Sequence, residues 1–228
     1  MNCILQTPTP DLDQSIDFYT RLGFKQLIGG EHTVFSDGKA VVLVNTDRKA
    51  RAGIRMYRQD WSDKLDGLRQ LANVIEVSGG YLLTDPSGVY IYLINGDNPV
   101  SPTVADESFS LAGKYMGLSL ETGDFPRSEA LYKVLGFSLT AGGADKGWAS
   151  FDLDGFGISL MPPLSCPHLF FNPSLTCFNG GKNLPVIEKI REAGIQVTEE
   201  ITVFNKDGLV DNIIIRDPGG FGFFIFND

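Results

Sequence analysis

Cysteine and histidine are scarce in this sequence of 228 residues. It contains three cysteines, Cys3, Cys166 and Cys177, and two histidines, His32 and His168. Three cysteines leave one unpaired in any disulfide scheme, and none has the CxxC spacing of a zinc site, so we expect reduced cysteines. A Ser-His-Asp or Cys-His catalytic arrangement would have to recruit one of two loop histidines. No phosphate-binding glycine motif stands at a strand-to-helix junction.

Long apolar runs and an excess of positive charge are also missing. No segment approaches the roughly 18 apolar residues of a membrane span, and residues 1–15 lack the basic start and apolar run of a signal peptide, which predicts a cytoplasmic protein. The net charge of -9 repels phosphate backbones and anionic lipids, so we expect no nucleic acid and no membrane as partner. A small-molecule ligand, including a cationic one, fits this charge better.

The two halves of the sequence repeat one another. Matched segments occur in the same order in both halves, which predicts a tandem duplication. The spacing between partners grows along the chain, so the second copy carries insertions, for which 161–171 and 197–215 are the candidates. The matched pairs are DLDQSIDFYTRLGF (11–24) with DFPRSEALYKVLGF (124–137), VFSDGKAVVLVN (34–45) with SFDLDGFGISLM (150–161), and TDPSGVYIYLIN (84–95) with RDPGGFGFFIFN (216–227).

Each copy divides again into two smaller modules. An apolar strand precedes each of four helix-like stretches, which begin near Asp11, Asp60, Asp124 and Gly181. The first has apolar residues at helical spacing, an Asp at the expected N-cap and a glycine after its end. The segment between the copies is rich in Pro, Ser, Asp and Asn and lacks an apolar period. We therefore predict domains at 1–97 and 112–228, joined by a linker at 98–111.

The pattern D-(x)3-S-(x)3-Y-(x)2-L-G-F, followed farther on by D-P-(S/G)-G and an apolar strand, occurs once in each half. This pair of motifs resembles the vicinal oxygen chelate superfamily, which includes glyoxalase I, extradiol dioxygenases and bleomycin-resistance proteins. The resemblance covers nearly the whole chain. It implies an α+β fold: a tandem duplication of glyoxalase-like domains, each made of two βαβββ modules curled around a cavity. Most relatives hold a divalent metal there, but a fold does not fix a function.

The resemblance also implies positions for the metal ligands, and in this sequence those positions lack strong donors. The position seven residues before each helix-starting Asp, where metal-binding members have His or Gln, holds Ile4, Gly53, Gly117 and, in the fourth module, Asn172 or Pro173. The position seven residues after the Asp of each D-P-x-G motif, where the family has a carboxylate, holds Tyr92 and Phe224, and the matching positions on earlier strands fall near Leu43 and Ser159. Among the positions before the helices, only the fourth offers even a weak oxygen donor, through Asn172, and the other positions hold no carboxylate. We therefore predict no metal and no other cofactor.

Side chains alternate between the faces of a strand, so if Gly117 faces the cavity, Ser119 and Glu121 do so too. Glu121 is the candidate catalytic residue, because a carboxylate in an apolar cavity can act as a general base or bind a cationic group. A solvated carboxylate at a strand end is the alternative. The predicted ligand-binding residues are Gln6, Tyr90, Tyr92, Ser119, Trp148, Ser159, Phe224 and Phe226, with core packing as the alternative for the aromatic ones.

Two hypotheses for the function follow. The first is a metal-free protein, similar to the bleomycin-resistance branch, that binds a small organic molecule in an aromatic-lined cavity. The second is an enzyme of the same superfamily: a metal-dependent lyase or dioxygenase, or a metal-free isomerase with Glu121 as base. Whether the protein is an enzyme stays open at this point. The chain is expected to be a monomer, in which the duplication forms a pseudo-dimer, or a homodimer.

Overall fold

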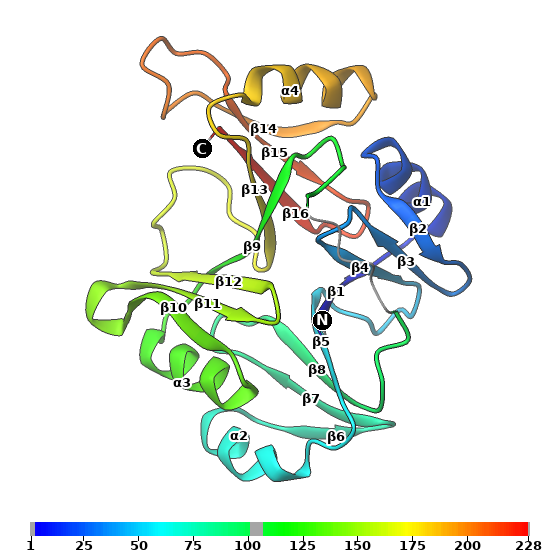
Figure 1. Cartoon of the computed structure of the whole chain (residues 1–228), viewed down its shortest axis with the longest axis vertical. Helices are drawn as coiled ribbons and strands as arrows, with labels where there is room; N and C mark the ends of the chain where they lie inside the picture. Colours follow the sequence, from blue (N-terminus) through cyan, green and yellow to red (C-terminus); the bar gives the residue numbers. More distant parts are fainter. Residues whose placement is uncertain (1–2, 101–106, 228) are drawn as a thin grey trace.

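A computed structural model describes residues 3–100 and 107–227. These residues form two eight-stranded sheets, one from each half of the chain, with helices packed against them (Figure 1). No helix within this part of the chain is long and apolar enough to cross a membrane. Of the predicted linker at 98–111, residues 101–106 lie outside the described residues, and the domain boundaries stay predictions.

The elements of the N-terminal half are β1 (Cys3–Pro8), α1 (Leu12–Arg21), β2 (Lys25–Ile28), β3 (His32–Ser36), β4 (Val41–Asn45), β5 (Gly53–Arg58), η1 (Ser62–Lys64), α2 (Leu65–Leu71), β6 (Ile75–Val77), β7 (Gly80–Thr84) and β8 (Tyr90–Asn95). Those of the C-terminal half are β9 (Lys114–Glu121), α3 (Phe125–Leu135), β10 (Ser138–Gly143), η2 (Ala144–Lys146), β11 (Trp148–Leu153), β12 (Phe156–Met161), β13 (Ser174–Phe178), α4 (Asn183–Glu192), β14 (Val197–Ile201), β15 (Asn212–Arg216) and β16 (Gly222–Phe226).

The two sheets have the same topology. Their strand orders are β2-β3-β4-β1-β5-β8-β7-β6 and β10-β11-β12-β9-β13-β16-β15-β14. The first strand of each module pairs in parallel with the last strand of that module, and the two first strands of each half pair antiparallel. Each half is therefore two βαβββ modules joined side by side. The predicted α+β tandem duplication is confirmed.

Local sequence sets where the helices begin. The Asp11 carboxylate accepts from the Gln14 N–H, so Asp11 is an N-cap, as predicted, and Asp124, where a helix start was predicted, caps α3 in the same way through the Arg127 N–H. The N-cap expected at Asp60 is wrong, because the caps of η1 and α2 are Trp61 and Lys64. Near Asp60 the chain first makes a short 3-10 turn before α2 begins. The predicted insertions lie where the chain leaves matched strands: 161–171 runs from β12 towards β13, and 197–215 contains β14 and most of β15.

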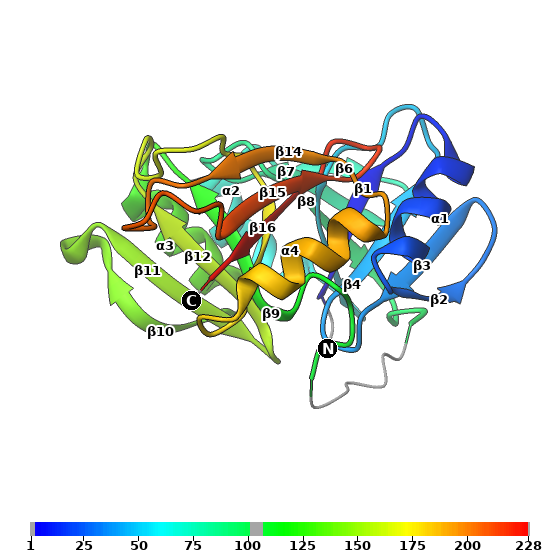
Figure 2. The ribbon, with the colours of Figure 1, turned by 90° about the horizontal axis from the view of Figure 1, so that it is seen from above.

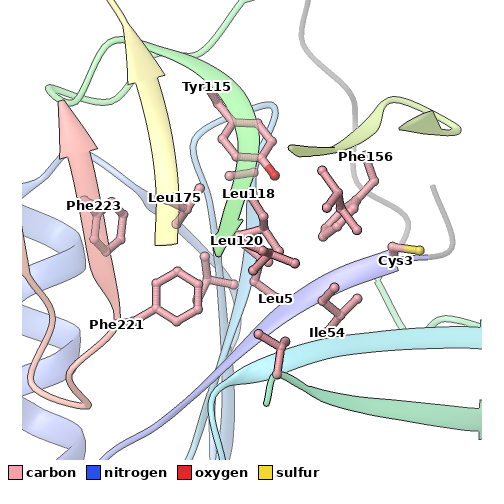
Figure 3. Packing of buried hydrophobic residues seen from close by; sticks show 14 of the residues in the cluster. Cys3, Leu5, Ile54, Tyr115, Leu118, Leu120, Phe156, Leu175, Phe221 and Phe223 are labelled. Atoms are coloured by element: carbon pink, nitrogen blue, oxygen red, sulfur yellow. The ribbon is translucent and has the colours of Figure 1, made fainter. Parts of the chain in front are cut away.

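One apolar core joins the two halves. Leu5 and Ile54 from the N-terminal sheet point towards Leu118 and Leu120 of the C-terminal sheet (Figure 3), and all four belong to one buried cluster that also includes residues of the helices. Because strand residues alternate in direction, this core uses one face of every central strand. The opposite face, which points away from the shared core, is called the cavity face below.

The helices pair the modules crosswise. Arg21 of α1 donates to the carbonyl of Gly194, beyond α4, while Arg127 of α3 donates to the carbonyl of Leu71 at the end of α2. Module 1 therefore lies beside module 4, and module 2 beside module 3 (Figure 1). Figure 2 shows α4 crossing β15 and β16 of the fourth module, with α1 next to it.

Two buried tyrosine–aspartate hydrogen bonds tie these module pairs together. Tyr19 of α1 donates to Asp217 at 3.0 Å, and Tyr132 of α3 donates to Asp85 at 2.7 Å. The aspartates are those of the two D-P-x-G motifs, and the tyrosines are those of the two helix motifs. Burial raises the pKa of Asp217 to about 6, although several hydrogen bonds, including that from Tyr19, favour its charged form. The repeated motif residues thus bond to each other across the duplication.

The Tyr19→Phe variant is expected to lower the free energy of unfolding by about 1–3 kcal/mol at pH 7.5, because the charged Asp217 carboxylate loses a buried donor. The folded pKa of Asp217 lies above its unfolded value, so this carboxyl stabilises the fold most below about pH 4 and progressively less as the pH rises through 6. At pH 4.5 the carboxyl is mostly neutral, and the Tyr19 hydrogen bond favours its charged form. The loss of stability caused by the variant is therefore expected to be smaller at pH 4.5. Urea denaturation at both pH values measures it.

Tyr81→Phe is the matched control, because Tyr81 packs only partly buried against the same core. An equal loss in Tyr19→Phe at both pH values would show that the hydroxyl does not act on the charged carboxylate.

Candidate functional site

The cavity face of the C-terminal sheet holds an open cavity of about 550 Å³. Its lining comes from the strands β9 to β13, so the third module and the first strand of the fourth form it. Five hydroxyl side chains line it together with apolar groups, and Asp152 is its one charged residue. The hydroxyls are those of Ser119, Thr140, Ser150, Ser159 and Thr176, and the principal apolar side chains are Met116, Met161 and Phe178.

The hydroxyls are paired along the cavity floor. Ser119 and Thr176 lie 2.6 Å apart on the adjacent central strands β9 and β13, and both are buried. Ser150 and Ser159 lie 3.4 Å apart on β11 and β12. In each pair one hydroxyl donates to the other, so one O–H and acceptor lone pairs remain for a ligand. Such a floor suits a polar molecule without a negative charge.

The insertion between β12 and β13 covers the part of the same cavity face that belongs to the fourth module. The ring of His168 packs 5.3 Å from that of Phe224 and 5.4 Å from that of Phe226, and Phe170 also packs against Phe224. The backbone N–H of Leu164 donates to Glu121 at 3.2 Å. The fourth module's half of this face is therefore occupied by the chain's own side chains.

The N-terminal sheet has a different cavity face. An apolar cluster of Ile4, Val34, Val41 and Leu43 is covered by Val100, which follows β8. Beside it, the buried Gln6 accepts hydrogen bonds through Oε1 from Asn45 at 3.1 Å and from Arg55 at 2.8 Å. The guanidinium group of Arg55 also lies 5.8 Å from the ring centroids of both Tyr57 and Tyr92. This face combines aromatic rings with a positive charge.

The predicted site residues separate into groups. Ser119 and Ser159 line the open cavity, and Gln6, Tyr90 and Tyr92 lie on the cavity face of the other sheet, in the alternation expected. Phe224 and Phe226 lie beneath the insertion rather than in the open cavity. Trp148, 47% exposed, begins β11 outside the lining.

Glu121 lies at the end of β9 and is not among the residues that line the cavity. Its side chain holds the insertion through the Leu164 N–H, and its own N–H donates to Asn172 Oδ1 at 3.0 Å. These contacts describe a structural role. A catalytic role for Glu121 stays a prediction.

The metal-ligand positions do not fit a metal ion. Within the described parts of the chain, no group of three or more His, Cys, Asp or Glu side chains lies together. The strand register places Ser174, and not Asn172 or Pro173, at the position that corresponds to Gly53. Gly53 pairs with Gln6, and Ser174 pairs with Ser119, the equivalent of Gln6 in the second half. The Ser174 hydroxyl donates to the Phe171 carbonyl, and the Asn172 amide is bonded to the backbone of Glu121 and Ser87.

At Gly53 and Gly117 the backbone itself excludes a ligand side chain. A Cβ atom at Gly53 would lie 2.0 Å from the Tyr90 carbonyl oxygen, and one at Gly117 would lie 2.6 Å from that of Gly157. Gly117 also has φ of +136°, which side chains other than that of glycine rarely adopt. Half of the histidine positions in the superfamily pattern therefore cannot accept any side chain here.

Solved structures share this architecture. A homoprotocatechuate 2,3-dioxygenase from Brevibacterium fuscum superposes with a TM-score of 0.61 at 16% identity, over 100% of this chain and 71% of that chain. The 2,3-dioxygenase LapB from Pseudomonas sp. KL28 gives 0.57 at 15% identity, over 99% and 91%. A catechol 2,3-dioxygenase gives 0.54 at 13% identity, over 97% and 85%. The chain has the vicinal oxygen chelate fold. No protein-family model and no curated protein matches the sequence.

Arg55 and Thr176 were not predicted from the sequence. Arg55 lies two residues after Gly53 on β5, and Thr176 lies two residues after Ser174, the equivalent of Gly53, on β13. The alternation that selected Gln6 and Ser119 therefore also reaches these two side chains, which lie opposite Tyr92 and Phe224 in the register.

The Gly117→His variant is expected to lower the free energy of unfolding by about 2 kcal/mol or more, because it adds a strained φ to a backbone clash. It is not expected to gain affinity for Fe²⁺, Mn²⁺ or Zn²⁺. Met116→His, at the exposed neighbouring residue, is the control and should stay close to the parent. Denaturation curves with and without each metal test this, and a Gly117→His protein of parental stability that binds metal would contradict it.

Proposed function

We propose that this protein binds a small organic molecule in the hydroxyl-lined cavity of its C-terminal half, without a metal ion. The observation that supports this most is the cavity of about 550 Å³, a size typical of ligand sites, formed by five hydroxyls and several apolar side chains. The lack of strong ligands at the positions where the superfamily pattern has them supports binding without a metal ion.

The lining also favours a class of ligand. Asp152 is the one charged residue there, and no Lys or Arg lines the cavity to pair with an anion. Burying an anion without a cationic partner is costly. A neutral hydroxylated molecule, or one with a cationic group near Asp152, fits this site, with Met116, Met161 and Phe178 contacting its apolar parts.

A dioxygenase-type enzyme is the second candidate, and the comparisons favour it over metal-free binding. The neighbours are named as homoprotocatechuate and catechol 2,3-dioxygenases, and they match 100% and 97% of this chain. An enzyme of this type would need metal ligands from positions outside the superfamily pattern. The metal-free isomerase with Glu121 as base is the remaining alternative, for which the contact with Leu164 gives no support.

Metal content separates the two candidates. Protein purified without a histidine tag is expected to contain well under one equivalent of Fe, Mn or Zn by elemental analysis. Added divalent ions are expected to leave its melting temperature unchanged. One equivalent of tightly bound metal would overturn the metal-free proposal and support the dioxygenase candidate.

The Ser159→Trp variant tests the cavity itself, because the indole group would occupy it. A thermal-shift screen of small molecules, grouped as neutral, cationic and anionic, is expected to give stabilising compounds mainly in the first two groups. These compounds should lose their effect in Ser159→Trp but keep it in Ser78→Trp, a change in an exposed turn of the other half. Stabilisation that persists in Ser159→Trp would place the binding elsewhere.

A further inference from the structure

The two sheets carry different chemistry at equivalent positions of their cavity faces. The strand registers equate Gln6 with Ser119 and Arg55 with Thr176, since each pair occupies the same step on the central strands. In the C-terminal half two neutral hydroxyls meet at this point. In the N-terminal half a buried amide meets a guanidinium group. The duplication thus places a positive charge in one half alone.

Arg55 is held in place by uncharged partners. Its Nε donates to Tyr57 Oη at 3.0 Å and its Nη1 donates to Gln6 Oε1 at 2.8 Å. Gln6 is fully buried, and its amide also bonds to Asn45 and to the Arg51 carbonyl, so its orientation is fixed. The rings of Tyr57 and Tyr92 flank the guanidinium group. Its orientation is therefore set before any ligand arrives, which lowers the entropy cost of binding.

The donors of Arg55 are only partly used. Arginine has five N–H groups, and the Tyr57 and Gln6 oxygens accept two of them, so three remain on Nη1 and Nη2. None of the ion pairs formed among residues 3–100 and 107–227 includes Arg55. Tyr115 Oη is the one fully buried polar side-chain atom there that lacks a hydrogen-bond partner, so Arg55 Nη2, which has none, is accessible to solvent.

We propose that Arg55 is the anchor of a second binding site, which takes a small organic carboxylate. Nη1 keeps one N–H besides the one given to Gln6 and Nη2 keeps two, and one N–H from each nitrogen can match the two oxygens of a carboxylate. The neighbouring sequence 47–51 carries Arg48, Lys49 and Arg51 against one acidic residue, Asp47, so it has a local excess of positive charge in a chain of net charge -9. Tyr92, half-buried beside Arg55, offers a ring for the ligand's apolar part. The site does not depend on the proposed function of the C-terminal cavity.

Benzoate is a suitable probe, because it joins a carboxylate to a flat ring. Calorimetric titration at constant ionic strength is expected to show millimolar or tighter binding of one equivalent, and the Arg55 Nε–H signal in ¹⁵N NMR spectra is expected to shift. Arg55→Gln should weaken binding about tenfold or more, as loss of a charge-assisted pair predicts. Arg58→Gln, which removes an exposed arginine paired with Asp63, is the matched control and should bind normally.

Arg55→Lys is a second variant in case Arg55→Gln does not fold. It keeps the positive charge but lacks the planar guanidinium group that can donate to both oxygens of a carboxylate. It is expected to fold and to bind benzoate more weakly than the parent protein. Equal benzoate binding by Arg55→Gln and the parent would overturn the proposal. The absence of binding up to about 20 mM, well above the affinity of one charge-assisted pair, would do so too. Inorganic phosphate binding as tightly as benzoate, with the same dependence on Arg55, would indicate an adventitious ion only.

Discussion

The shared apolar core between the two halves determines where this protein has room for a ligand. Leu5 and Ile54 pack towards Leu118 and Leu120, so one face of the central strands in both sheets is committed to that core. Because side chains alternate along a strand, the opposite face is left for the open cavity, the insertion and Arg55. The crosswise Tyr–Asp hydrogen bonds are buried beside the same core and join modules of opposite halves. The fold and the position of its cavities therefore follow from one packing arrangement.

Within that common frame the halves have diverged on the face that the core does not constrain. The C-terminal half keeps an open, hydroxyl-lined cavity on its third-module side, while the insertion with His168 and Phe170 fills the fourth-module side. The N-terminal half has an apolar cluster covered by Val100 and, beside it, the oriented guanidinium group of Arg55. A duplicated scaffold can thus carry two unlike surfaces, because changes there leave the shared core intact.

The sequence was enough to predict the parts that depend on local period and repetition. The tandem copies follow from matched segments, and the N-cap at Asp11, the helix start at Asp124 and the face on which Gln6 and Ser119 lie follow from spacing along single segments. What it did not predict depends on neighbours from distant segments. The contact of Arg55 with Gln6 crosses two strands far apart in sequence, and the insertion over Phe224 hides a ring that strand alternation alone would expose. No Asp marks the start of the fourth helix, so counting back from Asn179 or Gly180 leads to Asn172 or Pro173 instead of Ser174.

Gly53 and Gly117 bear on how such a scaffold could change its chemistry. Both strands come so close to a neighbouring carbonyl that the space where a histidine would begin is already occupied by backbone. Side-chain substitution alone therefore cannot place a chelating histidine at these two positions, because the strands would first have to move apart. Point variants of this protein can therefore be screened for new organic ligands without creating a histidine metal ligand at either of these two positions.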